Sequence, residues 1–234
     1  MPTKRKSKKL NSQDRKLIQE IIRVDHAGEH GATQIYRGQL AIFNEHTEFG
    51  KEIKEMAEQE EIHKSTFDEL IVKEDVKPTI MFPIWNIAGY ALGVGTALLG
   101  KKAAMACTVA VEEVIGQHYE EQAEELKKRK IKPQLLKTVK KFREDELEHH
   151  DIGLEQLVTW YQQNDPLSPW HTLSRAALFA QNNEELNAAR EYRRAAESEE
   201  YDYEHSMILY RKSIIHLAHA EPVSYTHLTL PTKA

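Results

Sequence analysis

The chain has 234 residues, of which 29% are charged, and it contains only 10 glycines and 8 prolines. This length suits one domain, or one domain with an appendage, and the composition favours an all-α protein with a sizeable core. The net charge of −5 argues against nucleic acid as a partner, and the single cysteine, Cys107, excludes an internal disulfide framework and any multi-cysteine metal site.

Residues 1–11 carry the basic run KRKSKK and are predicted to form a disordered arm. Contact with anionic lipid is an alternative role for this arm. No apolar signal region precedes the first helical pattern, and the single cysteine fits a reducing compartment. We therefore expect a cytoplasmic, bacterial protein.

The first predicted helix covers residues 12–45. Apolar residues recur at three- and four-residue steps along one face, which only Asp25 and Glu29 interrupt. His26 and His30 flank Glu29, and we assign them either to the surroundings of that acid or to the surface. The helix therefore places a carboxylate on a stripe that should face the core.

The second predicted helix covers residues 50–72. Its apolar stripe is interrupted only by Glu60 and His63, which lie one turn apart. A single Glu-x-x-His pair is weak support for a metal site, because solvated helix surfaces often carry the same pattern. The rest of the chain has to decide between these two interpretations.

The segment from Pro78 to Gly100 contains no charged residue. Its length would allow a membrane span, but Pro83, Asn86 and several glycines should make it a poor isolated helix. We predict an apolar flap that meets the membrane surface and admits a lipid-like substrate. A buried helix or a contact between copies of the chain is the alternative.

The third predicted helix covers residues 102–129. Its apolar stripe includes Glu112 and Tyr119 but not Glu113, which shares a different stripe with other polar residues. Gly116 lies one turn after Glu112 and should leave space beside it. Glu112 is therefore the expected inward acid.

The fourth predicted helix covers residues 133–158 and includes the stretch FREDELEHHD. Glu146 and His149 fall on its apolar stripe, whereas His150 falls on another face. The third and fourth helices thus repeat the order of polar residues seen in the first and second. In each hairpin, one helix carries a Glu and the next carries a Glu-x-x-His pair. The two acids of a hairpin are separated by 31 residues in the first and 34 in the second.

This repeat predicts a site for two metal ions. A buried carboxylate costs several kcal/mol unless it is paired or binds a cation, and four would be untenable in an empty core. Two dications would balance four carboxylates, and oxygen-rich ligation with one imidazole per ion suits iron or manganese better than zinc. We therefore predict a ferritin-like four-helix bundle built from two helical hairpins. Asp25 and, more weakly, Asp145 are candidates to orient a ligand imidazole.

Three stretches carry a family resemblance: RVDHAGEHGA, PIWNIAGYALGVGTALLGKKAAMACTVAVEEVIGQHYEEQ and KFREDELEHHDIGL. They closely resemble the demethoxyubiquinone hydroxylase family, the Coq7-type enzymes of ubiquinone biosynthesis, over roughly residues 15–157. The resemblance implies a di-iron monooxygenase that hydroxylates the ring of a polyprenylated demethoxyquinone. It implies two iron ions, O2 as co-substrate, and electrons that come ultimately from NADH through the quinone.

The resemblance also implies roles for individual residues. Glu60 and Glu146 would bridge two irons, and His118 with Tyr119 matches a motif associated with substrate binding and electron transfer. Core packing is the alternative for Tyr119. The full set of implied iron ligands is Glu29, Glu60, His63, Glu112, Glu146 and His149. The chain departs from the family where His30 replaces a common tyrosine and Gln117 a frequent histidine, and we expect tuning rather than loss of function.

The implied location is peripheral, on the cytoplasmic face of the bacterial cell membrane. The implied partners are a polyprenyl quinone, the membrane surface, other proteins of ubiquinone biosynthesis and a second copy of the chain. A ferritin-like iron-storage or peroxide-scavenging protein is the competing function, although it would not need an apolar segment between its hairpins. A non-catalytic partner with degenerate metal binding is disfavoured by the complete ligand set.

The chain departs from the family pattern after about residue 158. We assign residues 12–158 to the ferritin-like di-iron domain and residues 159–221 to a divergent, polar C-terminal region with an extra helix. Residues 222–234, PVSYTHLTLPTKA, differ from everything before them. We interpret them as an unstructured tail, and a non-native origin is one explanation for their composition.

Overall fold

The computed structural model describes residues 10–198 and 203–220, so most of the predicted basic arm and the predicted tail lie outside the described residues. The described part is helical and contains no strand, which confirms the all-α prediction. It forms two compact units, Met1–His150 and Asp151–Ala234, and the predicted boundary at residue 158 falls inside a helix. The helices are α1 (Ser12–Leu40), α2 (Glu48–Lys73), α3 (Phe82–Leu98), α4 (Lys101–Arg129), α5 (Pro133–Asn164), α6 (Pro169–Gln181), α7 (Glu185–Ala196) and α8 (Tyr203–Ala220).

Side-chain caps fix the starts of α1 and α2. The Asn11 side chain accepts a hydrogen bond from the Asp14 backbone N–H at 2.7 Å, and Thr47 accepts one from the Gly50 backbone N–H at 3.0 Å. Each cap satisfies a backbone donor that the helix itself leaves without a partner. The first helix ends at Leu40 rather than at residue 45, because the chain turns before the Thr47 cap.

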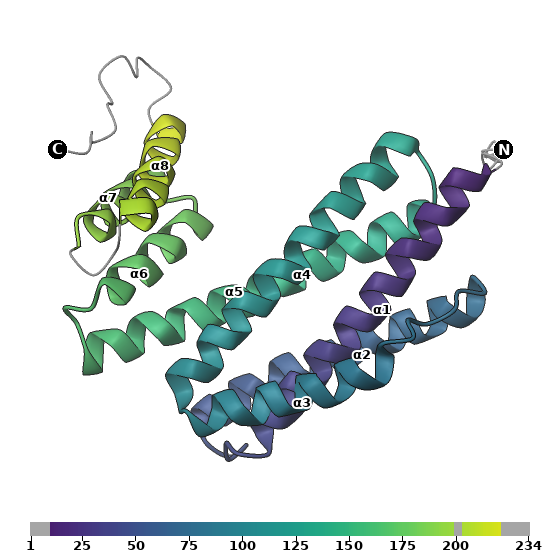
Figure 1. Cartoon of the computed structure of the whole chain (residues 1–234), viewed down its shortest axis with the longest axis horizontal. Helices are drawn as coiled ribbons and strands as arrows, with labels where there is room; N and C mark the ends of the chain where they lie inside the picture. Colours follow the sequence, from purple (N-terminus) through teal and green to yellow (C-terminus); the bar gives the residue numbers. More distant parts are fainter. Residues whose placement is uncertain (1–9, 199–202, 221–234) are drawn as a thin grey trace, which may run out of the picture. The chain divides into compact units, whose positions relative to one another are not determined.

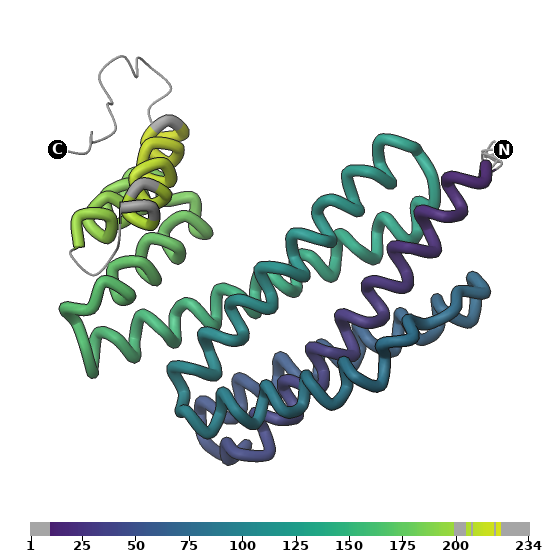
Figure 2. The backbone as a smooth tube through the Cα atoms, in the orientation of Figure 1, coloured from purple at the N-terminus to yellow at the C-terminus, as the bar shows by residue number. Residues whose placement is uncertain are grey.

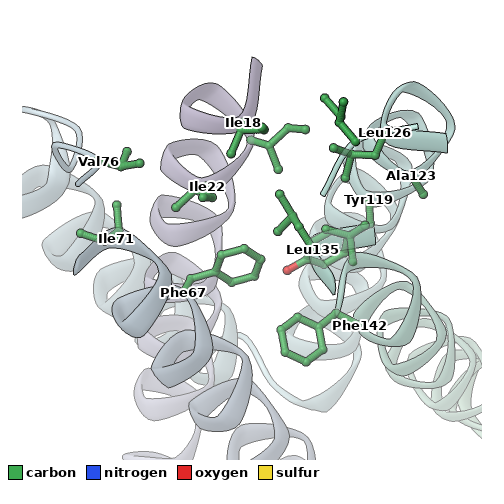
Figure 3. Close-up of a cluster of buried hydrophobic side chains, with 13 residues drawn as sticks. Ile18, Ile22, Phe67, Ile71, Val76, Tyr119, Ala123, Leu126, Leu135 and Phe142 are labelled. Atoms are coloured by element: carbon green, nitrogen blue, oxygen red, sulfur yellow. The ribbon is translucent and has the colours of Figure 1, made fainter. Parts of the chain in front are cut away.

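The first unit is the predicted bundle of two helical hairpins, α1–α2 and α4–α5 (Figure 1). Figure 3 shows apolar side chains from all four helices meeting in one cluster. Ile22, Phe67, Leu126 and Val139 in this cluster are completely buried. The ferritin-like four-helix bundle is therefore confirmed, and its apolar cluster fixes the facing sides of the helices.

The inter-hairpin segment, predicted to be an apolar flap and a poor helix in isolation, forms a helix when it is packed against α1. Residues Phe82–Leu98 form the regular helix α3, which packs along α1 (Figures 1 and 2). A Cβ added at Gly93 would lie 2.1 Å from the Ile35 carbonyl oxygen, and one added at Gly38 would lie 2.5 Å from the Tyr90 carbonyl oxygen. Glycine is thus used here because the two backbones approach too closely for side chains.

The outer side of α3 is apolar and exposed, with Ile87 at 73% and Trp85 at 50% exposure. The alternative of a buried helix therefore holds only for the side that faces α1. Among the described residues, no helix combines the length and apolar character that crossing a membrane requires.

The second unit contains three described helices after the end of α5, whereas the sequence predicted one. Asn183, with a φ of 57°, lies in the turn between α6 and α7, where this left-handed backbone conformation ends the helical run. Small residues allow close packing in this unit. Its core contains Ala176, Ala188, Tyr192, Ala195, Ala196 and Leu209.

Candidate metal centre

The structure brings all six predicted ligands together inside the bundle. α1 supplies Glu29, α4 supplies Glu112, and α2 and α5 each supply a Glu-x-x-His pair. None of the six side chains is more than 2% exposed. The inward faces of α4 and α5 are the predicted ones. Glu113 is exposed whereas Glu112 is buried, and His150 is only partly buried whereas His149 is buried.

The six residues form two overlapping groups whose ligand atoms lie within 4.8 Å of one another. The first group is Glu29, Glu60, His63 and Glu146, and the second is Glu60, Glu112, Glu146 and His149. Each histidine faces the acid of the other hairpin: His63 Nδ1 lies 3.1 Å from a Glu146 oxygen, and His149 Nδ1 lies 3.1 Å from a Glu60 oxygen. Glu60 and Glu146 are shared by both groups, which fits the bridging positions assigned to them.

Unpartnered polar atoms at this cluster match what two metal ions need. Both carboxylate oxygens of Glu60 and of Glu146 are buried without a hydrogen-bond partner. The same is true of one oxygen each of Glu29 and Glu112 and of the Nδ1 atoms of both histidines, which are buried without a hydrogen-bond partner. Because buried polar atoms are normally satisfied, this many orphaned atoms aimed at one place fit a dinuclear metal site.

The remaining oxygens of the two terminal acids are held by tyrosines that cross the bundle. Tyr36 on α1 donates its hydroxyl hydrogen to Glu112 on α4, and Tyr119 on α4 donates to Glu29 on α1. Both tyrosines are about 1% exposed, and Figure 3 shows Tyr119 among the apolar side chains of the core. Tyr119 therefore combines core packing with a polar contact at the site. The contact between Tyr36 and Glu112 was not predicted from the sequence.

Each ligand imidazole is oriented by a hydrogen bond from its outer nitrogen. His63 Nε2 donates to Asp145 at 3.0 Å, and His149 Nε2 donates to the Gln59 side-chain oxygen at 2.7 Å. This contact sets which nitrogen faces the site. Asp145 thus occupies the position suggested for it. Gln59 was missed, although it precedes Glu60 as Asp145 precedes Glu146.

Two other predicted site residues lie elsewhere. Asp25 contacts no ligand imidazole in the described structure and instead accepts a hydrogen bond from Gln122 at 2.6 Å. His118 is exposed on α4, and the role in substrate binding and electron transfer that the resemblance implies for it stays a prediction. Gly116 is buried beside Glu146, and a Cβ added there would meet only the Glu146 Cβ, at 3.9 Å, so this position has room for at least a methyl group.

The electrostatics of the cluster are unfavourable without cations. Burial, followed by repulsion from neighbouring carboxylates, raises the pKa of Glu60 and of Glu112 well above the ordinary value. Burial also raises the pKa of Glu146. Burial alone would lower the pKa of His63, but contacts with Glu146 and Glu29 raise it to about 10. Protons or cations must therefore neutralise these acids, and cations can do so for all four at once.

Fold and site together define a class: ferritin-like helical bundles that carry a buried cluster of four carboxylates and two imidazoles on two repeated hairpins. Sequence comparison then gives the family. The model of the ubiquinone biosynthesis protein COQ7 matches residues 16–177, and the chain belongs to this family.

Individual relatives agree with this family. The chain is 52% identical over 148 residues to the NADPH-dependent 3-demethoxyubiquinone 3-hydroxylase of Bos taurus mitochondria, covering 62% of this chain and 68% of that protein. It is 49% identical over 137 residues to the 3-demethoxyubiquinol 3-hydroxylase of Rhodospirillum rubrum, covering 58% and 64% of the two chains. It is 37% identical over 165 residues to the mitochondrial 5-demethoxyubiquinone hydroxylase of Saccharomyces cerevisiae, covering 64% and 70%.

Proposed function

We propose that the chain is a di-iron monooxygenase that hydroxylates the ring of a polyprenylated demethoxyubiquinone or demethoxyubiquinol with O2, a late step of ubiquinone biosynthesis. The observation that carries this proposal is the cluster of six buried ligands with orphaned oxygens and nitrogens, in a chain of a ubiquinone-biosynthesis family. Iron bound at this cluster would supply the redox chemistry that activates O2.

The chain's own residues hold the two ions and exclude water. Glu29 and His63 would bind one ion and Glu112 and His149 the other, and Glu60 and Glu146, which belong to both groups, would contact both ions. The hydroxyls of Tyr36 and Tyr119 leave each terminal acid only one free oxygen. The apolar cluster of the four helices keeps the site dry at one end, so that electrostatic interactions inside it are strong.

The outer side of α3 is the proposed contact with the membrane surface and with the apolar tail of the substrate. It presents a continuous set of apolar side chains without a charged residue, which suits the boundary between lipid headgroups and acyl chains. These exposed residues are Ile84, Trp85, Ile87, Tyr90, Leu92, Leu98 and Leu99. We further propose peripheral binding at the cytoplasmic face of a bacterial membrane; relatives of the chain are named from a bacterium and from mitochondria.

A flotation assay with phospholipid vesicles tests this contact. We expect the wild-type protein to float with the vesicles and the Trp85→Ser, Ile87→Ser double variant to remain in the soluble fraction. The control is Val72→Ser, which removes an apolar side chain of 81% exposure from α2. Equal flotation of the double variant and the wild type would contradict the proposed role of α3.

The electron donor is proposed to be a reduced nicotinamide nucleotide. The resemblance implied NADH, whereas the name of the Bos taurus relative specifies NADPH. An assay that supplies each nucleotide separately will decide between them.

The decisive experiment is a product assay. The iron-loaded protein is supplied with a short-chain demethoxyquinone, O2 and either NADH or NADPH, and the product is analysed by mass spectrometry. We expect a product heavier by one oxygen atom, and labelled O2 should deliver the label to the ring. Binding of two irons without any hydroxylated product would instead favour the storage or scavenging function.

A further inference from the structure

A second cluster of metal-binding side chains lies on the outside of the α1–α2 hairpin. It consists of His26 and His30, one turn apart on α1, and Asp68 on α2. His26 Nε2 lies 3.0 Å and His30 Nε2 lies 2.9 Å from the same carboxylate oxygen of Asp68. The function proposed above leaves both histidines without a role.

We propose that His26, His30 and Asp68 form a mononuclear site for a divalent transition-metal ion, with Zn²⁺ as the preferred occupant. Two imidazoles and one carboxylate are a common ligand set for zinc, and three protein ligands leave a fourth position for water. The same three ligands can also hold Fe²⁺, but Mn²⁺ and Fe²⁺ bind more weakly than Zn²⁺ in the general order of divalent metals.

The spacing of the ligand atoms suits this ion. Ligands at about 2.0 Å around a tetrahedral zinc lie about 3.3 Å apart, so the observed separations need to open by only a few tenths of an ångström. They are slightly shorter than the 3.1–3.8 Å between histidine nitrogens and carboxylates at the six-residue centre. Rotation of the Asp68 side chain, which is 44% exposed, can provide this opening and a path for the ion.

The two imidazoles are held in place by packing. The ring of Phe82, the first residue of α3, stacks on His26 at a centroid distance of 5.1 Å and meets His30 edge-on at 4.4 Å. Their side chains are only 6% and 13% exposed. A rigid pair of ligands lowers the entropy lost on metal binding.

The charges of the ligands are also suitable. Burial is the main reason that the pKa of His26 is lowered, which favours the neutral imidazole that binds metals. Partial burial acts to raise the pKa of Asp68, but the hydrogen bond from His30 and the charges of the two histidines and Lys64 lower it overall. Lys64 lies 3.8 Å from the other Asp68 oxygen and leaves the oxygen that faces the histidines free of lysine contacts.

Zinc binding to the full-length, iron-loaded protein tests the proposal. Zn²⁺ is titrated against a chromophoric chelator while the iron content is monitored. We expect the wild type to bind one more Zn²⁺ than Asp68→Ala or His30→Ala, or to bind it at least about tenfold more tightly. We also expect Zn²⁺ to raise the thermal unfolding midpoint of the wild type but not of these variants.

Two matched controls separate this site from other histidines. His216→Ala disrupts a different group of two histidines and one acid, His216, His219 and Glu185. His46→Ala removes an exposed histidine. Both controls should bind as much Zn²⁺ as the wild type. If the wild type and Asp68→Ala bind Zn²⁺ equally, the proposal is wrong. The cluster would then be only two imidazoles that donate hydrogen bonds to one carboxylate. The test uses the difference between variants, so it does not depend on whether the six-residue centre takes iron.

Discussion

At the scale of single residues, the two hairpins share not only their metal ligands but also the residues that contact those ligands. Tyr36 follows Glu29 by seven residues and Tyr119 follows Glu112 by seven, and each tyrosine donates to the acid of the other hairpin. The residue before each Glu-x-x-His pair likewise accepts a hydrogen bond from a ligand imidazole. One helical stripe cannot reveal such contacts, because the partner lies on a different helix.

The inward register of α4 gives the first prediction. Glu112→Ala removes a ligand that is 2% exposed, and we expect it to abolish the iron-dependent absorption of the purified protein. Glu113→Ala changes an exposed neighbour and should leave this absorption largely intact. Absorption spectra and iron analysis of both variants provide the measurement, and the reverse result would show that Glu113 is the ligand.

Loss of one tyrosine hydroxyl gives the second prediction. In Tyr119→Phe, a buried oxygen of Glu29 loses its donor, so we expect the free energy of unfolding to fall by about 1–3 kcal/mol. The control is Tyr90→Phe, whose side chain is 43% exposed and which should change stability by less than about 0.5 kcal/mol. Urea unfolding of the metal-loaded proteins measures both values. Equal stabilities would mean that the Tyr119 hydroxyl contributes little.

At the scale of helices, sequence periodicity predicted the four helices that face the site. It predicted their inward residues because an apolar stripe marks the buried face wherever a helix is exposed on the other side. It did not predict α3 as a helix, because glycines that destabilise an isolated helix also permit close packing against a second helix. It also predicted one extra C-terminal helix where the described residues form three.

The α1–α3 contact gives the third prediction. Gly93→Ala places a Cβ against the backbone of Ile35, so we expect stability to fall by about 1–3 kcal/mol as α3 shifts away from α1. Gly95→Ala, on the same helix, meets no atom within 4 Å and should raise stability by up to about 1 kcal/mol. Thermal and urea unfolding of both variants test this. A Gly93→Ala protein as stable as the wild type would show that the contact can adjust.

At the scale of the whole molecule, stability is coupled to the charge of the buried cluster. Without metal, three of its carboxyls have raised pKa values and therefore retain protons that the unfolded chain releases. With metal bound, the same acids must be ionised. The dependence of stability on pH should therefore have opposite signs in the two states.

This gives the fourth prediction. For the metal-free protein, the stabilisation from Glu60, Glu112 and Glu146 is complete below their ordinary pKa of 4.5 and is lost as pH rises through their raised values. His63 acts in the same direction, because its contribution is complete below pH 6.5 and disappears as pH passes about 10. His149, whose pKa burial lowers, opposes this trend below pH 6.5.

Urea unfolding between about pH 5.5 and 8.5 measures this effect. We expect the free energy of unfolding to fall with increasing pH when a chelator is present, and to rise when the metal is bound. Parallel pH profiles in the two states would contradict the assignment of these acids as metal ligands.

The crosswise arrangement of ligands has a consequence for the order of folding. Each of the two groups draws at least one carboxylate from the opposite hairpin, so a single hairpin in isolation presents an incomplete set. Under the proposed function, metal can therefore meet the complete ligand set only after the two hairpins have docked. In a chain without metal, protons on the buried carboxyls stabilise the fold instead, and this stabilisation weakens as pH rises.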